Sequence, residues 1–221
     1  MKDPWVNLPL QPDYVLPADR EPIADFNATT DNDHRIHLEL LPAPFLGRPN
    51  APVVLLNLNP SFSEKDHVAH ADPYFAQTSR ANLVHGDLAY PFYLLDPRNA
   101  FSSGASWWVR YLRTLLASVE RQRLANSLLC VEYFPYHSPR FPALPRTLES
   151  QTYSFWLVRR AIEREAVITV LRGDSYWREA VPELEKYSRS YRLRNWQSVW
   201  VTEGNCPEGY PEVLRALTQE T

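Results

Sequence analysis

The chain has 221 residues, a formal net charge of −3 and 44% hydrophobic residues. This length fits one α/β domain with an arm, the small net charge argues against a general polycation, and no apolar run approaches the ~18 residues of a membrane span. Two cysteines, Cys130 and Cys206, are too few for a disulfide framework or a four-cysteine metal site. Because no signal pattern opens the chain either, we expect a cytoplasmic protein.

The first fifty residues are rich in proline and acidic residues. Proline favours extended and turn geometry over regular helix. We therefore expect residues 1–50 to form an arm packed on the domain, with a short ordered piece at 36–41. Residues 51–221 would form the α/β domain itself.

Four later segments are typical of strands, and three of them are nearly continuous apolar runs. Strands that are covered on both faces have this pattern, and they usually pair in parallel. The four segments are 53–58, 128–131, 166–171 and 198–201.

Helical spacing separates these strands. The expected helices are 107–119, 153–161, a segment at 174–187 that Pro182 should bend or restart, and 210–218. Residues 60–105 form a long, aromatic-rich connection of the kind that is often functional. The alternation of strands and helices predicts an α/β fold, a three-layer α/β/α arrangement around a four-stranded, mainly parallel sheet.

Ligands of open parallel sheets bind beyond the carboxyl ends of the strands. The first predicted strand ends at Asn59-Pro60, the second at Glu132-Tyr133, the third at Arg172-Gly173 and the fourth at 202–205. The first, second and fourth ends carry the candidate chemistry.

The order of these motifs resembles the uracil-DNA glycosylase superfamily over roughly residues 50–217. The resemblance rests on VVLLNLNPSF (53–62), the pair Pro91-Phe92, CVEYFPYHS (130–138), VLRGDSYW (170–177) and VWVTEGNCPEGYPEVLRAL (199–217). The Asn-Pro version of the first motif is similar to the mismatch-specific and single-strand-selective branches. The resemblance implies a four-stranded parallel sheet, DNA as partner and cleavage of a base–sugar bond after base flipping.

The resemblance also implies roles for single residues. Asn59 would orient the attacking water, Phe92 would stack on the extruded base, and Tyr133 belongs to the second motif. Two positions depart from the family pattern: its base-reading Asn falls on Glu132, and its last-loop His is absent from 202–207. Asn59 has a structural alternative, which is to cap the strand before Pro60.

Glu132 is the most informative of these residues. If ionised, its carboxylate can only accept hydrogen bonds, which suits the exocyclic amine of cytosine and repels the O4 face of uracil. If protonated by burial, it can donate instead, and it could replace the missing His as acid or base. The structural alternative is a salt bridge to one of the many arginines.

Further candidates surround these positions. The remaining base-binding candidates are Phe62 and Tyr93, with Tyr90 as a substitute for Phe92, although each could equally be a core residue. The candidate DNA contacts are Ser61, His137, Ser138, Arg140, Gly204, Asn205, Cys206 and Pro207, with Arg146 and Arg172 as weaker phosphate contacts. The loop that contains residues 204–207 could instead be an ordinary strand-to-helix turn.

Metal and cofactor chemistry have little support. His67, His70 and Asp72 form a His-x-x-His-x-Asp string, but no helical pattern or fourth ligand supports a metal site. Phosphate-binding glycine loops are absent. We therefore predict neither metal nor cofactor.

Three functions remain open. The first is a monofunctional DNA glycosylase that acts on a damaged or modified base, with Glu132 favouring a modified cytosine, in repair or in defence against phage DNA. It would act as a monomer on DNA. The second is an inactive nucleic-acid-binding module of the same fold, and the third is a hydrolase of free nucleosides or nucleotides.

Overall fold

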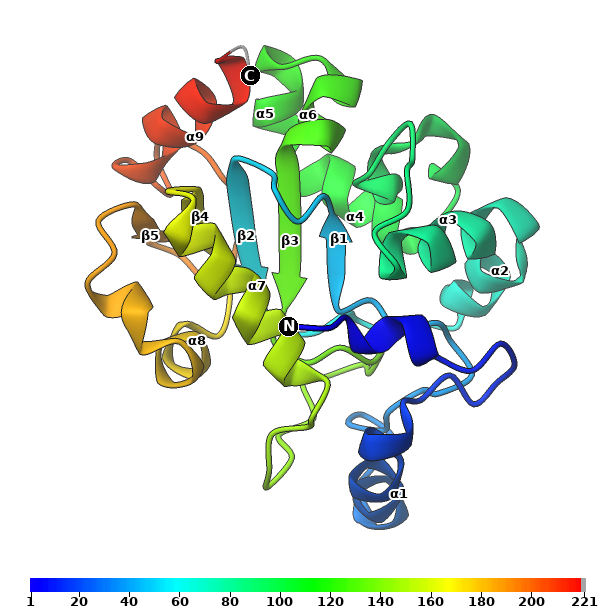
Figure 1. Ribbon diagram of the computed structural model, residues 1–221. Coiled ribbons are helices and arrows are strands. Elements are labelled where there is room, and N and C mark those ends of the chain that lie inside the picture. Colours follow the sequence, from blue (N-terminus) through cyan, green and yellow to red (C-terminus); the bar gives the residue numbers. More distant parts are fainter. Residues whose placement is uncertain (220–221) are drawn as a thin grey trace.

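The computed structural model describes residues 1–219, which fold around one five-stranded sheet of order β1-β3-β2-β4-β5 (Figure 1). Strands β2, β3, β4 and β5 run parallel, and β1 pairs antiparallel with β3. This arrangement confirms the α/β class and the mainly parallel sheet, with one strand more than expected. The strands are β1 (Phe45–Gly47), β2 (Val53–Asn57), β3 (Leu128–Glu132), β4 (Val167–Val170) and β5 (Ser190–Arg192).

Alternation along the buried strands divides the interior into two cores. Val54 and Leu56 of β2 face one core, whereas Val53 and Leu55 face the other. All five β2 residues are buried, because helices cover both faces of the sheet. The result is the expected three-layer architecture.

The first core lies under α7 and the N-terminal segment, and Figure 1 shows α7 crossing in front of the sheet. The second core lies under α4, α5, α6 and α9. The helices are α1 (Arg20–Thr29), α2 (Lys65–Ala71), α3 (Pro73–Leu83), α4 (Ser103–Tyr111), α5 (Arg113–Ser118), α6 (Arg121–Ser127), α7 (Gln151–Glu163), α8 (Asp174–Ala180) and α9 (Gly209–Thr218). Short 3-10 turns span Pro4–Asn7, Pro17–Asp19, Tyr93–Leu95, Pro97–Asn99 and Pro182–Glu185.

The N-terminal fifty residues differ from a simple arm. Trp5, Val15 and Ile23 are fully or almost fully buried in the first core. Residues 36–41 contribute an isolated bridge between His37 and His137 rather than a strand. The ordered strand is β1 instead, so the sheet begins before the expected boundary at residue 50.

The predicted fourth strand is wrong. Residues 198–201 form a loop, and the fourth parallel strand is β5. The apolar residues of this segment are nevertheless core residues, because Val199 and Val201 are buried. However, the Asn205 side-chain amide donates to the carbonyls of Ser198 (2.7 Å) and Trp200 (2.9 Å), and these bonds hold the segment as a loop.

Two other segments also depart from expectation. The predicted helix 107–119 is interrupted at Leu112, between α4 and α5, and the 60–105 connection contains α2 and α3. The segment at 174–187 behaves as expected, since α8 ends at Ala180 and a short turn restarts at Pro182. Among the described residues no helix combines the length and apolarity needed to cross a membrane.

Candidate active site

A pocket of about 250 Å³ lies at the carboxyl ends of β2 and β3, on the α4 side of the sheet. Its size is near the lower end of the ~300–1,000 Å³ typical of small-molecule sites, so it suits a compact ligand. Polar residues from four segments line it together with aromatic rings. They are Asn57, Asn59, Ser61, Ser63, Asp66, His70, Ser102, Ser103, Glu132, His137 and Arg172, with Phe75, Tyr93, Trp107 and Trp108 among the apolar lining.

Asn57 and Glu132 form the floor of this pocket. They are direct register partners on β2 and β3, so their side chains leave the same face of the sheet. Asn57 Nδ2 donates to Glu132 Oε1 at 3.0 Å. The bond fixes the carboxyl group at the strand ends.

Residue Glu132 is only 4% exposed, and its Oε2 atom is buried with no hydrogen-bond partner among the described residues. Burial raises the pKa of Glu132 to about 8, although the Asn57 hydrogen bond and the charge of Arg172 act in the opposite direction. At neutral pH the group is therefore mainly a neutral acid that can both donate and accept. The salt-bridge alternative is not what the structure shows.

Asn59 is held in one orientation by the second motif. Its Nδ2 lies 3.2 Å from the Ser138 carbonyl oxygen, 3.1 Å from Ser138 Oγ and 3.2 Å from the Pro60 carbonyl oxygen. Carbonyl oxygens only accept, so the amide nitrogen must face them. Asn59 Oδ1 is then directed away from these groups as an acceptor for a ligand or water.

His137 presents an unpartnered ring nitrogen. Its Nδ1 lies 2.7 Å from the Ser61 carbonyl oxygen, which requires a proton on Nδ1. The Nε2 atom is buried and has no partner within residues 1–219. Burial lowers the pKa of His137, so the neutral ring offers Nε2 as an acceptor.

His70 and Asp66 complete the polar wall from α2, four residues apart on one helix face. The His70 ring is perpendicular to that of His137, with centroids 5.3 Å apart, and its Nδ1 accepts from the Leu41 N–H at 3.1 Å. Burial lowers the pKa of His70 to about 3. Asp66 accepts from the Ser63 N–H (2.7 Å) and from the hydroxyls of Ser63 and Ser103.

Phe92 does not have its expected role. Its side chain is fully buried in the second core, where it packs edge-on against Trp108. Its backbone N–H donates to the carbonyl of Ala125 in α6, which precedes β3. Phe92 is thus a core residue behind Trp108 and is not part of the pocket lining. Of the aromatic candidates in this segment, Tyr93 does line the pocket.

Two other base-binding candidates also lie elsewhere. Tyr133 follows Glu132 and therefore leaves the opposite face of the sheet, where it packs against Phe155 and Trp177. Phe62 stacks on His37, with ring centroids 3.4 Å apart, and is not part of the pocket lining.

The candidate DNA contacts are divided among several environments. Ser61 and His137 line the pocket, and Ser138 is buried behind Asn59. Arg140 pairs with Asp33 at 3.1 Å, and Arg146 is exposed at a separate hollow.

The last loop is organised around its own contacts. The Asn205 amide bonds to backbone carbonyls, Cys206 is buried, and Gly204 is exposed. Cys206 and Pro207 line a different hollow, beside β5. The structure therefore does not bring residues 204–207 into the pocket lining.

The His-x-x-His-x-Asp string is used for separate purposes. His70 lines the pocket, His67 lies 3.7 Å from Glu64, and Asp72 caps α3 by accepting from the Phe75 N–H. Within residues 1–219 no group of three His, Cys, Asp or Glu side chains is arranged to hold a metal ion.

Sequence reasoning missed Asn57, Asp66 and Trp107 as pocket residues. Asn57 could have been found, because it stands two residues before Asn59 in an otherwise apolar strand and must share a face with its neighbour at i+2. Asp66 could have been found from its i, i+4 relation to His70. Trp107 has no comparable signal, because its spacing fits a core-facing helix residue.

No family model, no curated protein and no solved structure matches this chain.

Proposed function

We propose that the protein hydrolyses the N-glycosidic bond of a damaged or modified base in DNA, with the base held in the pocket beside Glu132. The observation that carries this proposal is the convergence of Asn59, Glu132 and His137 around one aromatic-lined pocket at the carboxyl edge of the sheet. Asn59 follows β2, whereas Glu132 ends β3 and His137 follows it.

The pocket supplies what a flat heterocycle needs. Phe75, Tyr93 and Trp107 offer ring surfaces for stacking, which is worth about 1–3 kcal/mol per base. Neutral Glu132 offers one donor and one acceptor. It can pair with cytosine, whose edge presents an amine and a ring nitrogen, or with a base whose edge presents a carbonyl and a ring N–H.

The reaction follows from the same groups. Asn59 Oδ1 would accept a hydrogen bond from the attacking water and direct its oxygen toward C1′ of the sugar. The C1′–N bond breaks with its electron pair passing to the base, and the water proton passes to His137 Nε2 or to Asp66. Glu132 would donate to the departing base, which offsets the missing last-loop His.

A second candidate is a hydrolase of free nucleosides. It is favoured by the charge of the lining, in which Arg172 is balanced by Asp66 while Glu132 is mainly neutral. A DNA-binding rim usually shows a clear excess of positive charge, whereas a nucleoside needs none.

The test is an assay for released base. Oligonucleotides that carry uracil, hypoxanthine or substituted cytosines, and the matching free nucleosides, are incubated with the protein, and the free base is measured by mass spectrometry. We expect release from at least one oligonucleotide and its loss in Asn59→Ala. Release from nucleosides alone favours the second candidate.

Binding of the oligonucleotides without any release would instead indicate an inactive binding module. If neither DNA nor nucleosides are bound or cleaved, the proposal fails. Arg160→Gln, a change on the exposed face of α7 at an Arg160–Glu163 pair, is the control variant and should leave release unchanged.

A further inference from the structure

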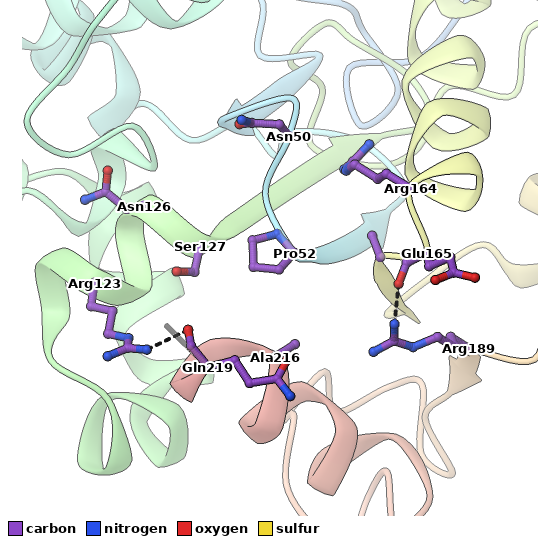
Figure 2. A pocket seen from close by; sticks show the side chains of 11 residues that line it. Asn50, Pro52, Arg123, Asn126, Ser127, Arg164, Glu165, Arg189, Ala216 and Gln219 are labelled. Atoms are coloured by element: carbon purple, nitrogen blue, oxygen red, sulfur yellow. Dashed lines mark hydrogen bonds between the residues drawn. The ribbon is translucent and has the colours of Figure 1, made fainter. Parts of the chain in front are cut away.

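A larger hollow of about 700 Å³ lies at the other end of the sheet, before the amino ends of β2, β3 and β4. Figure 2 shows its lining, which comes from the segments that precede β2 and β4, from the end of α6, and from α9 with the chain beyond it. Three arginines, Arg123, Arg164 and Arg189, lie around it. No role in the candidate active site involves these residues.

The arginines are held by neutral groups. Arg123 donates from Nε and Nη2 to the carbonyls of Leu217 (2.8 Å) and Gln219 (2.9 Å), and Arg164 donates from Nη2 to the carbonyl of Ala51 at 3.1 Å. Arg189 donates to the Glu165 carbonyl. Carbonyl oxygens fix the guanidinium groups in place and leave their positive charge unneutralised.

Carboxylates do little to balance these charges within residues 1–219. Of the three arginines, Arg189 forms an ion pair within this part of the chain: it pairs with Glu212, and the N and O atoms are 4.0 Å apart. Among residues 1–219, Glu165 is the single acidic residue in the lining. The surroundings therefore favour an anion from solution.

Arg164 is the least satisfied of the three. Its Nε is buried without a hydrogen-bond partner among the described residues, and burial lowers the pKa of Arg164 to about 10. A buried donor without a partner is costly. Arg164 and Arg189 lie on one side of the hollow and Arg123 on the other (Figure 2), so positive charge is present on both sides of it.

We propose that this hollow binds a ligand with adjacent phosphate groups, held by Arg164 and Arg189 at one end and by Arg123 at the other. Arginine suits this role because its planar guanidinium can make two parallel hydrogen bonds to phosphate oxygens. Asn50, Asn126 and Ser127 add neutral polar groups along the lining. The phosphates can come from a free diphosphate or from a nucleic-acid backbone.

The arginine Nε–H resonances of ¹⁵N-labelled protein test this directly. The full chain is titrated in parallel with orthophosphate, pyrophosphate and a single-stranded oligonucleotide. We expect pyrophosphate or the oligonucleotide to shift the Arg164 and Arg189 resonances, with at least about tenfold tighter binding than orthophosphate. A pyrophosphate response assigns a small ligand, and a response to the oligonucleotide alone assigns a nucleic-acid backbone.

Variants distinguish binding in the hollow from nonspecific attraction to positive side chains elsewhere. Arg164→Gln or Arg189→Gln should weaken binding about tenfold or more, as loss of a charged hydrogen bond predicts. Arg160→Gln, one turn away on α7, and Asn59→Ala, in the other site, should not weaken it. Thermal unfolding checks that each variant is folded, and the titration of the unaltered protein does not depend on any variant.

The proposal is overturned if no ligand shifts the Arg164 resonance. It is equally overturned if Arg160→Gln weakens binding as much as Arg164→Gln, or if orthophosphate binds as tightly as pyrophosphate. Each of these results is independent of base release at the carboxyl edge.

Discussion

At the carboxyl ends of β2 and β3 a buried acid, two histidines and aromatic rings enclose a small pocket, whereas at the amino ends of the same strands three arginines surround a hollow more than twice as large. The strands between the two ends are apolar and buried. Strands β2 and β3 thus hold the two sites apart without contributing charged side chains between them. Because the sites share no side chain, changes at one end should be nearly additive with changes at the other.

Asn59→Ala should produce the largest difference between the two ends of the sheet. This change removes the group that would position water, and losses of about 100-fold or more are typical when a preorganised polar group is deleted. Base release should fall by this factor, while phosphate binding at the arginines stays the same. An equal loss of base release and of phosphate binding would mean that the variant is misfolded or that the two ends of the sheet are coupled.

Glu132→Gln should alter the pH dependence of stability. The native carboxyl has a pKa of about 8 against an ordinary 4.5, so the native state binds more protons than the unfolded state between these values. The free energy of unfolding should therefore fall by a few kcal/mol as pH rises from about 4.5 to about 8. The variant should lack this decline and be the more stable protein at pH 8. Chemical denaturation across this range measures the difference, and parallel curves would contradict a buried neutral acid.

His70→Gln should alter the pH dependence of stability in the acidic range. The pKa of His70 is about 3 in the folded protein against an ordinary 6.5, so stability should be lost as pH falls from 6.5 toward 3. At pH 5 this group accounts for about 2 kcal/mol. His85, whose pKa burial lowers to about 4, remains in the variant, so denaturation curves should show a smaller acid slope rather than none.

Two aromatic substitutions should have the smallest and most specific effects. Phe92→Leu alters a fully buried core ring and should lower stability by about 1–2 kcal/mol without changing the affinity for a base. Trp107→Leu alters a half-buried pocket wall and should raise the KM for the substrate with little loss of stability. Reversed effects would show that Phe92, as the resemblance implied, contacts the ligand.

The sequence predicted strands and site residues correctly where the pattern lies in neighbouring residues. Three apolar runs identified β2, β3 and β4, and the rule that ligands lie beyond parallel strand ends located Asn59 and Glu132. The sequence did not predict the features that depend on tertiary packing. Phe92 and Trp107 are both aromatic residues in plausible positions, and only their tertiary contacts separate a core ring from a pocket wall. The pattern at 198–201 describes burial correctly, but the loop bonds of Asn205 override strand pairing.

The most direct test of a base-binding pocket at Glu132 does not require catalysis. Protein with ¹³C-labelled glutamate carboxyl groups is titrated with free nucleobases, and the Glu132 resonance is identified with Glu132→Gln. We predict that a base will shift this resonance and its titration midpoint near pH 8, and that Trp107→Leu will weaken the response. A Glu132 resonance that titrates near its ordinary pKa, or that no nucleobase shifts, would contradict the account.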